Sequence, residues 1–113
     1  MLDPIFHITT DTDWQKALAT GEGYATASLS TEGFIHCSTR EQVAWVANGR
    51  FRGSEPLVLL RLDSEALTSE LRWEISEPGM APFPHIYGPI NRTAVKEVIP
   101  FPEGPDGFAA PDA

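Results

Sequence analysis

The sequence predicts a single α+β domain, in which a strongly bent or split mixed β-sheet is flanked by two helices. The chain has 113 residues, of which 42% are hydrophobic, and this is enough for one buried core but short for two. Apolar runs of strand length alternate with two segments in which helix-start residues precede helical spacing. We expect residues 1–101 to form one globular domain and residues 102–113, dominated by Gly, Pro, Ala and acidic residues, to form a flexible C-terminal tail.

Seven short runs rich in apolar residues are the expected strands. In chain order they are residues 4–9, 24–29, 34–38, 57–62, 71–76, 83–90 and 95–101. The run 57–62 is almost continuously apolar, which is typical of a central strand covered on both faces. The run 24–29 is the weakest, an extended segment followed by a turn. Because Pro84 has no amide hydrogen for a ladder, the run 83–90 is expected to start late or to lie at a sheet edge.

The two helices are expected after the first and third of these runs. Hydroxyl and carboxylate side chains at residues 10–13 can cap a helix that extends to about residue 19. Ser38 or Thr39 can cap the second helix, in which apolar residues repeat at helical spacing until an Asn-Gly pair at 48–49.

Charge and composition limit the classes of partner. The chain has 16 acidic and 8 basic residues, a formal net charge of -8, so its surface should repel nucleic-acid backbones and anionic membranes. No apolar run approaches the ~20 residues that span a bilayer, and the first residues lack the pattern of a signal peptide. The single cysteine, Cys37, fits a reducing compartment. We therefore expect a cytoplasmic protein with no general affinity for nucleic acids or membranes.

All three histidines interrupt apolar runs, and each is followed two places later by a hydroxyl side chain. The pairs are His7 with Thr9, His36 with Ser38, and His85 with Tyr87. Residues two apart in a strand share a face, so the two members of each pair should lie together. A buried imidazole without a hydrogen-bond partner costs roughly 1–3 kcal/mol, which favours one shared polar cleft. We expect this cleft to bind a small-molecule ligand.

The cleft supplies two sets of candidate site residues. The candidate catalytic residues are His7, His36, His85 and Glu74, because imidazoles and carboxylates can act as general acids and bases. The candidate cofactor-binding residues are Thr9, Ser38, Thr39 and Tyr87. Backbone amides at the helix start near Ser38 and Thr39 could bind a phosphate or carboxylate beside His36. Glu74 could equally be an exposed edge carboxylate, and Tyr87 could stack on a ligand or close the core.

Several catalytic and metal motifs are absent from the sequence. One cysteine cannot form a zinc ribbon, and the His-Glu-x-x-His motif does not occur, so no metal ligand is assigned. Thr26 stands where a dinucleotide-binding turn would place its third glycine. Cys37 points away from its neighbour His36 by strand alternation, and we expect it to be buried and not catalytic.

Four segments together resemble the bacterial domain of unknown function 952 family. They are Ile5-Phe6-His7-Ile8-Thr9, Glu32-Gly33-Phe34-Ile35-His36-Cys37-Ser38-Thr39, Trp73-Glu74 and Pro84-His85-Ile86-Tyr87-Gly88-Pro89-Ile90. The likeness extends from about residue 4 to residue 108. That family is similar to the ADP-ribosyltransferase superfamily, which includes the RNA 2′-phosphotransferases. The resemblance implies an ADP-ribosyltransferase-like split sheet whose cleft binds a nicotinamide dinucleotide, with NAD as the implied cofactor.

By the same resemblance, His7 and Thr9 would hold a ribose hydroxyl and the nicotinamide amide, and His36 and Tyr87 would line the cleft. Three functions follow from these observations. The first is a transferase-like enzyme acting on a nucleotide or nicotinamide dinucleotide. The second is a non-catalytic sensor of an anionic or nucleotide ligand, favoured because the superfamily usually has a glutamate late in the chain where this sequence has His85 and Tyr87. The third is a metal-dependent hydrolase with a three-histidine site.

Overall fold

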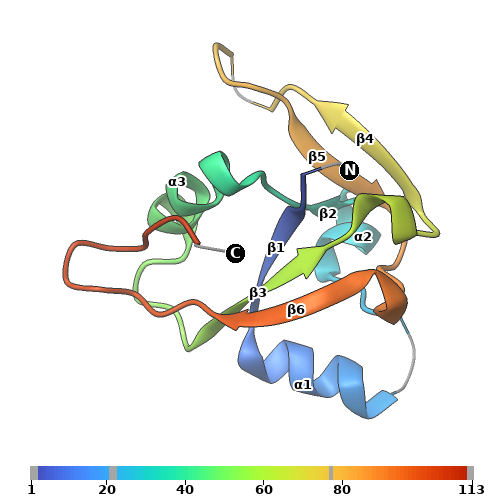
Figure 1. Cartoon of the computed structure of the whole chain (residues 1–113), viewed down its shortest axis with the longest axis horizontal. Coiled ribbons are helices and arrows are strands. Elements are labelled where there is room, and N and C mark those ends of the chain that lie inside the picture. Colours follow the sequence, from blue (N-terminus) through green and yellow to red (C-terminus); the bar gives the residue numbers. More distant parts are fainter. Residues whose placement is uncertain (1–2, 21–22, 77, 112–113) are drawn as a thin grey trace.

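A computed structural model describes residues 3–20, 23–76 and 78–111 (Figure 1). The helices in this part of the chain are α1 (Asp11–Thr20), α2 (Ala27–Thr31) and α3 (Arg40–Arg50), with short 3-10 turns η1 (Ser64–Ala66) and η2 (Arg92–Ala94). The strands are β1 (Ile5–Thr10), β2 (Ile35–His36), β3 (Leu57–Leu62), β4 (Glu70–Glu74), β5 (Phe83–Tyr87) and β6 (Val95–Pro100). They form two three-stranded sheets, so the expected α+β class and split sheet are confirmed.

The two sheets are antiparallel. One has the order β1-β3-β6 and the other the order β2-β5-β4, and every pairing between these strands is antiparallel. The expectation of a mixed sheet is therefore wrong. Hydrophobic patterning identifies a strand by its alternation but carries no information about the direction of its neighbours.

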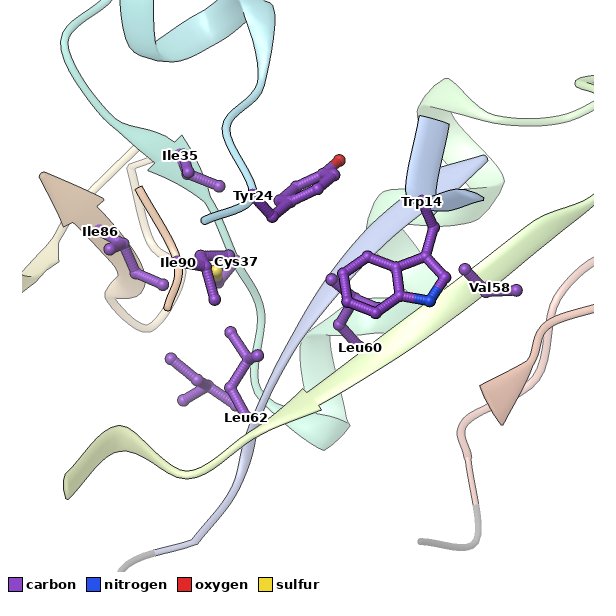
Figure 2. Packing of buried hydrophobic residues seen from close by; sticks show 10 residues of the cluster. Trp14, Tyr24, Ile35, Cys37, Val58, Leu60, Leu62, Ile86 and Ile90 are labelled. Carbon is purple, nitrogen blue, oxygen red and sulfur yellow. The ribbon is translucent and has the colours of Figure 1, made fainter. Parts of the chain in front are cut away.

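Strand β3 divides the core. It is the middle strand of its sheet, as its apolar run predicted. Val58, Leu60 and Leu62 point to one face and pack with Trp14 of α1 and with the second sheet (Figure 2). Leu57 and Leu59 point to the other face and pack beneath α3, whereas Arg61 is partly exposed and forms an ion pair with Glu97. A strand with two buried faces thus connects two clusters, which explains why nearly all of its residues are apolar.

Strand β5 begins at Phe83 and is the middle strand of the second sheet, so the expectation that Pro84 makes this strand start late or lie at an edge is wrong. Pro84 is opposite Trp73 of β4, and its carbonyl accepts a hydrogen bond of 3.0 Å from the Cys37 amide. Strand β5 donates few backbone hydrogen bonds to β2, because β2 pairs with it through two residues only. The missing amide hydrogen of Pro84 is tolerated for that reason.

The segment 24–33 differs most from its prediction. The expected weak strand and turn are replaced by an isolated bridge between Tyr24 and Ile90 and by the helix α2, so the described chain has three helices and not two. The Tyr24 amide donates to the Ile90 carbonyl at 2.8 Å, and the Ile90 amide donates back at 2.7 Å. This long-range bridge removes Tyr24 from any local strand and leaves the residues after it free to form a helical turn.

Residues after β6 fold back along α3. The Phe108 ring is buried and stacks on Phe101 with centroids 5.0 Å apart. The side chain of Asn48 donates to the Phe108 carbonyl at 3.1 Å and accepts from the Phe108 amide at 2.8 Å. The domain boundary at residue 101 stays a prediction, which a substitution at Phe108 can test. In the described ranges no helix has the length and apolar character needed to cross a membrane.

Candidate functional site

A cleft of about 350 Å³ lies where the two sheets meet, and all three histidines line it. Strand pairing brings them together. A bridge between Phe6 and Ser38 joins β1 to the segment after β2, and β2 pairs with β5 where His36 faces His85 (Figure 1). Other residues of the wall include Thr9, Tyr24, Ser38, Trp45, Ser76 and Phe83. Their roles in catalysis or binding stay predictions.

His7 forms the buried wall of the cleft. Its Nδ1 lies 2.7 Å from the His36 carbonyl oxygen, which can only accept, so Nδ1–H is the donor. Burial lowers the pKa of His7 from 6.5 to about 4, more than the hydrogen bond to this carbonyl raises it. The ring is therefore neutral near pH 7, and its Nε2 carries a lone pair without a proton.

The Tyr24 hydroxyl lies beside this nitrogen, and the Thr9 hydroxyl lies beside that of Tyr24. The Tyr24 hydroxyl oxygen is 3.2 Å from His7 Nε2, and the Tyr24 hydroxyl donates a hydrogen bond of 2.7 Å to Thr9 Oγ1. Burial raises the pKa of Tyr24 to about 12, so this phenol keeps its hydrogen. His7 Nε2, the Tyr24 hydroxyl and Thr9 Oγ1 therefore form one series of polar contacts along the cleft wall. Only the pairing of His7 with Thr9 was visible in the sequence, because Tyr24 arrives through its distant bridge to Ile90.

A second polar cluster surrounds His85. Glu74 Oε1 accepts hydrogen bonds from His85 Nδ1 at 2.8 Å and from the Tyr87 hydroxyl at 2.5 Å. These two bonds, that of Tyr87 first, lower the pKa of the Glu74 carboxyl. The His85 ring is buried and stacks on Phe34, with centroids 4.1 Å apart and planes at 19°. Glu74 and Tyr87 do not line the cleft but lie behind His85 and fix its orientation.

Ser76 is a site residue that the sequence analysis missed. Its Oγ lies 3.5 Å from His85 Nε2, and the residue lines the cleft. Ser76 follows Glu74 by two residues, so an extended backbone places the two side chains on one face. The signal was present in the run 71–76, but only hydroxyls that follow a histidine were considered.

His36 occupies the solvent-exposed side of the cleft. Nearly half of its side chain is exposed, and its Nε2 lies 3.0 Å from Glu32 Oε2. Its ring meets the His85 ring edge to face, with centroids 5.4 Å apart. The three histidines therefore have different surroundings, although their sequence contexts are alike.

The helix start near His36 is capped by Thr39, as the sequence predicted. The Ser38 amide donates to the Phe6 carbonyl at 2.8 Å, and Thr39 forms a capping box with Gln42. In this box the Thr39 amide donates to Gln42 Oε1, and the Gln42 amide donates to Thr39 Oγ1. These bonds occupy the amides of Ser38, Thr39 and Gln42, and the expected anion site at this helix start stays a prediction. Ser38 lines the cleft and Thr39 does not.

Cys37 is buried in the apolar cluster, as predicted from strand alternation. Its burial raises the pKa of the thiol far above its usual range. Across the described ranges no three His, Cys, Asp or Glu side chains are grouped so as to hold a metal ion. The ring nitrogens of His7 point to a carbonyl and a phenol, and those of His85 to a carboxylate and a serine. This geometry does not support the three-histidine metal site.

The similarity to known proteins extends over nearly the whole chain. Residues 8–98 match the family described as "Protein of unknown function (DUF952)". The crystal structure of protein CC0527 from Caulobacter crescentus is similar, with 35% identity and a TM-score of 0.81 over 93% of this chain and 91% of that chain. The solution NMR structure of CC0527 gives 36% identity and a TM-score of 0.79, over 95% and 91%. No curated protein matches the chain.

Proposed function

This chain belongs to the DUF952 family, and we propose that it binds a nucleotide-class small molecule in the histidine cleft, with a nicotinamide dinucleotide as the first candidate. The observation that carries the proposal is the series of polar contacts on the cleft wall, from the neutral His7 ring through the Tyr24 hydroxyl to the Thr9 hydroxyl. Neutral polar groups of this kind can exchange hydrogen bonds with a ligand without the cost of desolvating a charge.

The polar wall is complementary to two groups of a nicotinamide nucleoside. His7 Nε2 can accept from an amide N–H or a ribose hydroxyl. The hydrogen of Thr9 Oγ1 has only a distant partner, the Thr10 carbonyl at 3.5 Å, so it is available to donate to a ligand oxygen. A primary carboxamide and a vicinal diol each offer a donor and an acceptor side by side, which matches this pair.

The size and lining of the cleft agree with such a ligand. A volume of about 350 Å³ is near the lower end of small-molecule sites, which suits one nucleoside-sized half of a dinucleotide. Trp45, Phe51 and Phe83 provide aromatic surface for a flat ring, and Arg50 provides a positive charge for a phosphate. A local cation of this kind is compatible with the acidic net charge.

The alternative, a non-catalytic sensor, is favoured by the position of Glu74. A transferase would use a carboxylate near the ribose to stabilise positive charge as the bond to nicotinamide breaks. Glu74 lies behind His85, and among the described residues the carboxylate that lines the cleft is Asp13. The transferase-like reaction therefore needs Asp13 or an imidazole in this role. Binding without turnover would support the sensor.

Titration calorimetry with NAD, nicotinamide mononucleotide, ADP-ribose and adenosine monophosphate tests the proposal. We expect a nicotinamide nucleotide to bind, and Thr9→Val and Tyr24→Phe to weaken binding about fivefold each, which corresponds to a lost hydrogen bond of about 1 kcal/mol. Thr12→Val, on the exposed surface of α1, is the matched control. Absence of binding by all four compounds, or unchanged affinity in both cleft variants, would overturn the proposal. Release of nicotinamide, followed by NMR, distinguishes an enzyme from a sensor.

A further inference from the structure

We propose that Ser76, His85 and Glu74 form a nucleophile, a general base and a positioning residue for acyl transfer, and that the chain hydrolyses small carboxylic esters at this end of the cleft. The three side chains form a continuous series of contacts in space. Glu74 Oε1 is 2.8 Å from His85 Nδ1, and His85 Nε2 is 3.5 Å from Ser76 Oγ. A serine, an imidazole and a carboxylate in this order are the arrangement that activates a hydroxyl nucleophile.

The hydrogen-bond partners determine which ring nitrogen is basic. An ionised Glu74 carboxylate only accepts, so Nδ1 of His85 carries the hydrogen and Nε2 of the neutral ring is free. Nε2 can then accept the hydroxyl hydrogen of Ser76. The present separation is at the long end for a hydrogen bond, and catalytic contacts of this kind commonly shorten when a substrate is bound.

The surrounding structure keeps the ring in this orientation. Pairing between β4 and β5 places Glu74 opposite Phe83, two residues from His85, so the carboxylate and the imidazole are diagonal neighbours on one face. Stacking on Phe34 fixes the ring plane. Tyr87 donates to the same oxygen, Glu74 Oε1, and thereby holds the carboxylate in place. Ser76 is exposed beyond the end of β4, where a substrate can reach it.

The reaction balances with water as the only co-reactant. Ser76 Oγ attacks the ester carbonyl carbon while its hydrogen moves to His85 Nε2, which gives a tetrahedral intermediate. The bond from carbon to the alkoxy oxygen then breaks, and His85 returns the proton to the departing alcohol. Water next attacks the acyl group on Ser76, with His85 as the base, and releases the carboxylic acid and the free serine.

The cleft favours neutral substrates with an apolar acyl or alcohol part. Phe83 and Trp45 line the same cleft as Ser76, and their rings lie 6.5 Å apart between centroids. The acidic net charge of the chain disfavours the approach of anionic esters. The reaction requires no nucleotide, so it stands or fails independently of the nucleotide-binding proposal.

Two measurements test the proposal. The first is labelling with a fluorophosphonate probe, which forms a covalent bond to activated serines, and the labelled residue is identified by peptide mapping with mass spectrometry. The second is the rate of hydrolysis of p-nitrophenyl acetate. In the parent protein we expect the probe on Ser76 and saturable ester hydrolysis. Ser76→Ala should lose both, and this exposed substitution is not expected to disturb folding. Ser54→Ala, in the exposed connection between α3 and β3, is the matched control and should behave as the parent.

Glu74→Gln distinguishes positioning from a merely structural role. It should lower kcat at least about tenfold with little change in KM, because the neutral amide no longer stabilises the imidazolium that forms when Ser76 is activated. It should also change the pH profile of the labelling rate, whereas a loss of folded protein would lower the labelled fraction at every pH alike. A parent protein that the probe does not label at Ser76, or ester hydrolysis that persists in Ser76→Ala, would overturn the proposal.

Discussion

Acidification is expected to destabilise the fold through His7. Its pKa is about 4 in the folded protein, against 6.5 in an unfolded chain. Above pH 6.5 the ring is neutral in both states and the pH dependence from this group vanishes. Between pH 6.5 and 4 the unfolded chain binds a proton that the folded protein does not, so stability is lost as the pH falls. Below pH 4 both states are protonated and the loss reaches its limit.

The size of the effect follows from the difference between these two pKa values. Each unit corresponds to about 1.4 kcal/mol, so the full loss below pH 4 is about 3 kcal/mol. At pH 5 the loss is about 2 kcal/mol, because the unfolded chain is then almost fully protonated at this site and the folded protein is not. This is a large share of the roughly 5–15 kcal/mol that stabilises a typical domain. The His7 ring is buried, so solvent screens this effect little.

Urea unfolding of the parent and of His7→Gln at pH 8, 6.5 and 5 measures the effect. Glutamine can still donate to the His36 carbonyl, but it does not titrate. Contributions from all other groups cancel in the difference between the two proteins. We expect the parent to lose about 2 kcal/mol more than the variant between pH 8 and pH 5.

His36→Gln is a matched control, because His36 is exposed. This variant should lose as much free energy of unfolding between pH 8 and pH 5 as the parent does. An equal pH dependence in the parent and in His7→Gln would refute the reasoning. So would an NMR titration in which the His7 ring protons shift near pH 6.5 rather than near pH 4.

Two further predictions concern buried groups. Cys37 in the native protein should react with a thiol reagent far more slowly than in urea, because the thiol is buried and its pKa is raised; equal rates would contradict this. Phe108→Ala should lower the free energy of unfolding by about 3 kcal/mol, measured in urea, because the ring stacks on Phe101 in the core. A flexible tail after residue 101 would instead leave the stability unchanged.

Local patterns in the sequence were enough to predict the six strands of the described chain and the faces that meet at the cleft, although they also indicated a strand at 24–29 that does not form. The period of two in an extended chain places His7 and Thr9 on one face and sends Cys37 away from His36, and both results depend on backbone geometry alone. The continuous apolar run of β3 likewise predicted a central strand, because both of its faces are buried.

Features that depend on distant pairing were not predictable in this way. Tyr24 reaches the cleft through its bridge to Ile90, and nothing near it in the sequence indicates that partner. Glu74 was equally compatible with an exposed edge and with a site; it lies on the edge strand β4, and the register between β4 and β5 places it beside His85, which the sequence alone does not show. The side chain of Gln42 accepts from the Thr39 amide at the helix start, a contact that the sequence permits but does not require.

The contrast between His7 and His36 bears on how the cleft can recognise a ligand. Recognition of an anion by a protonated imidazole would give an affinity that rises as the pH falls. Recognition through Nε2 of the neutral His7 ring has a different pH dependence, because this ring stays neutral until the pH approaches 4. A ligand held by His7 therefore binds about equally well from pH 8 to pH 5, over the same interval in which the free protein loses stability. Since the ligand needs the neutral ring and the folded state, its binding opposes the acid-induced unfolding that His7 causes.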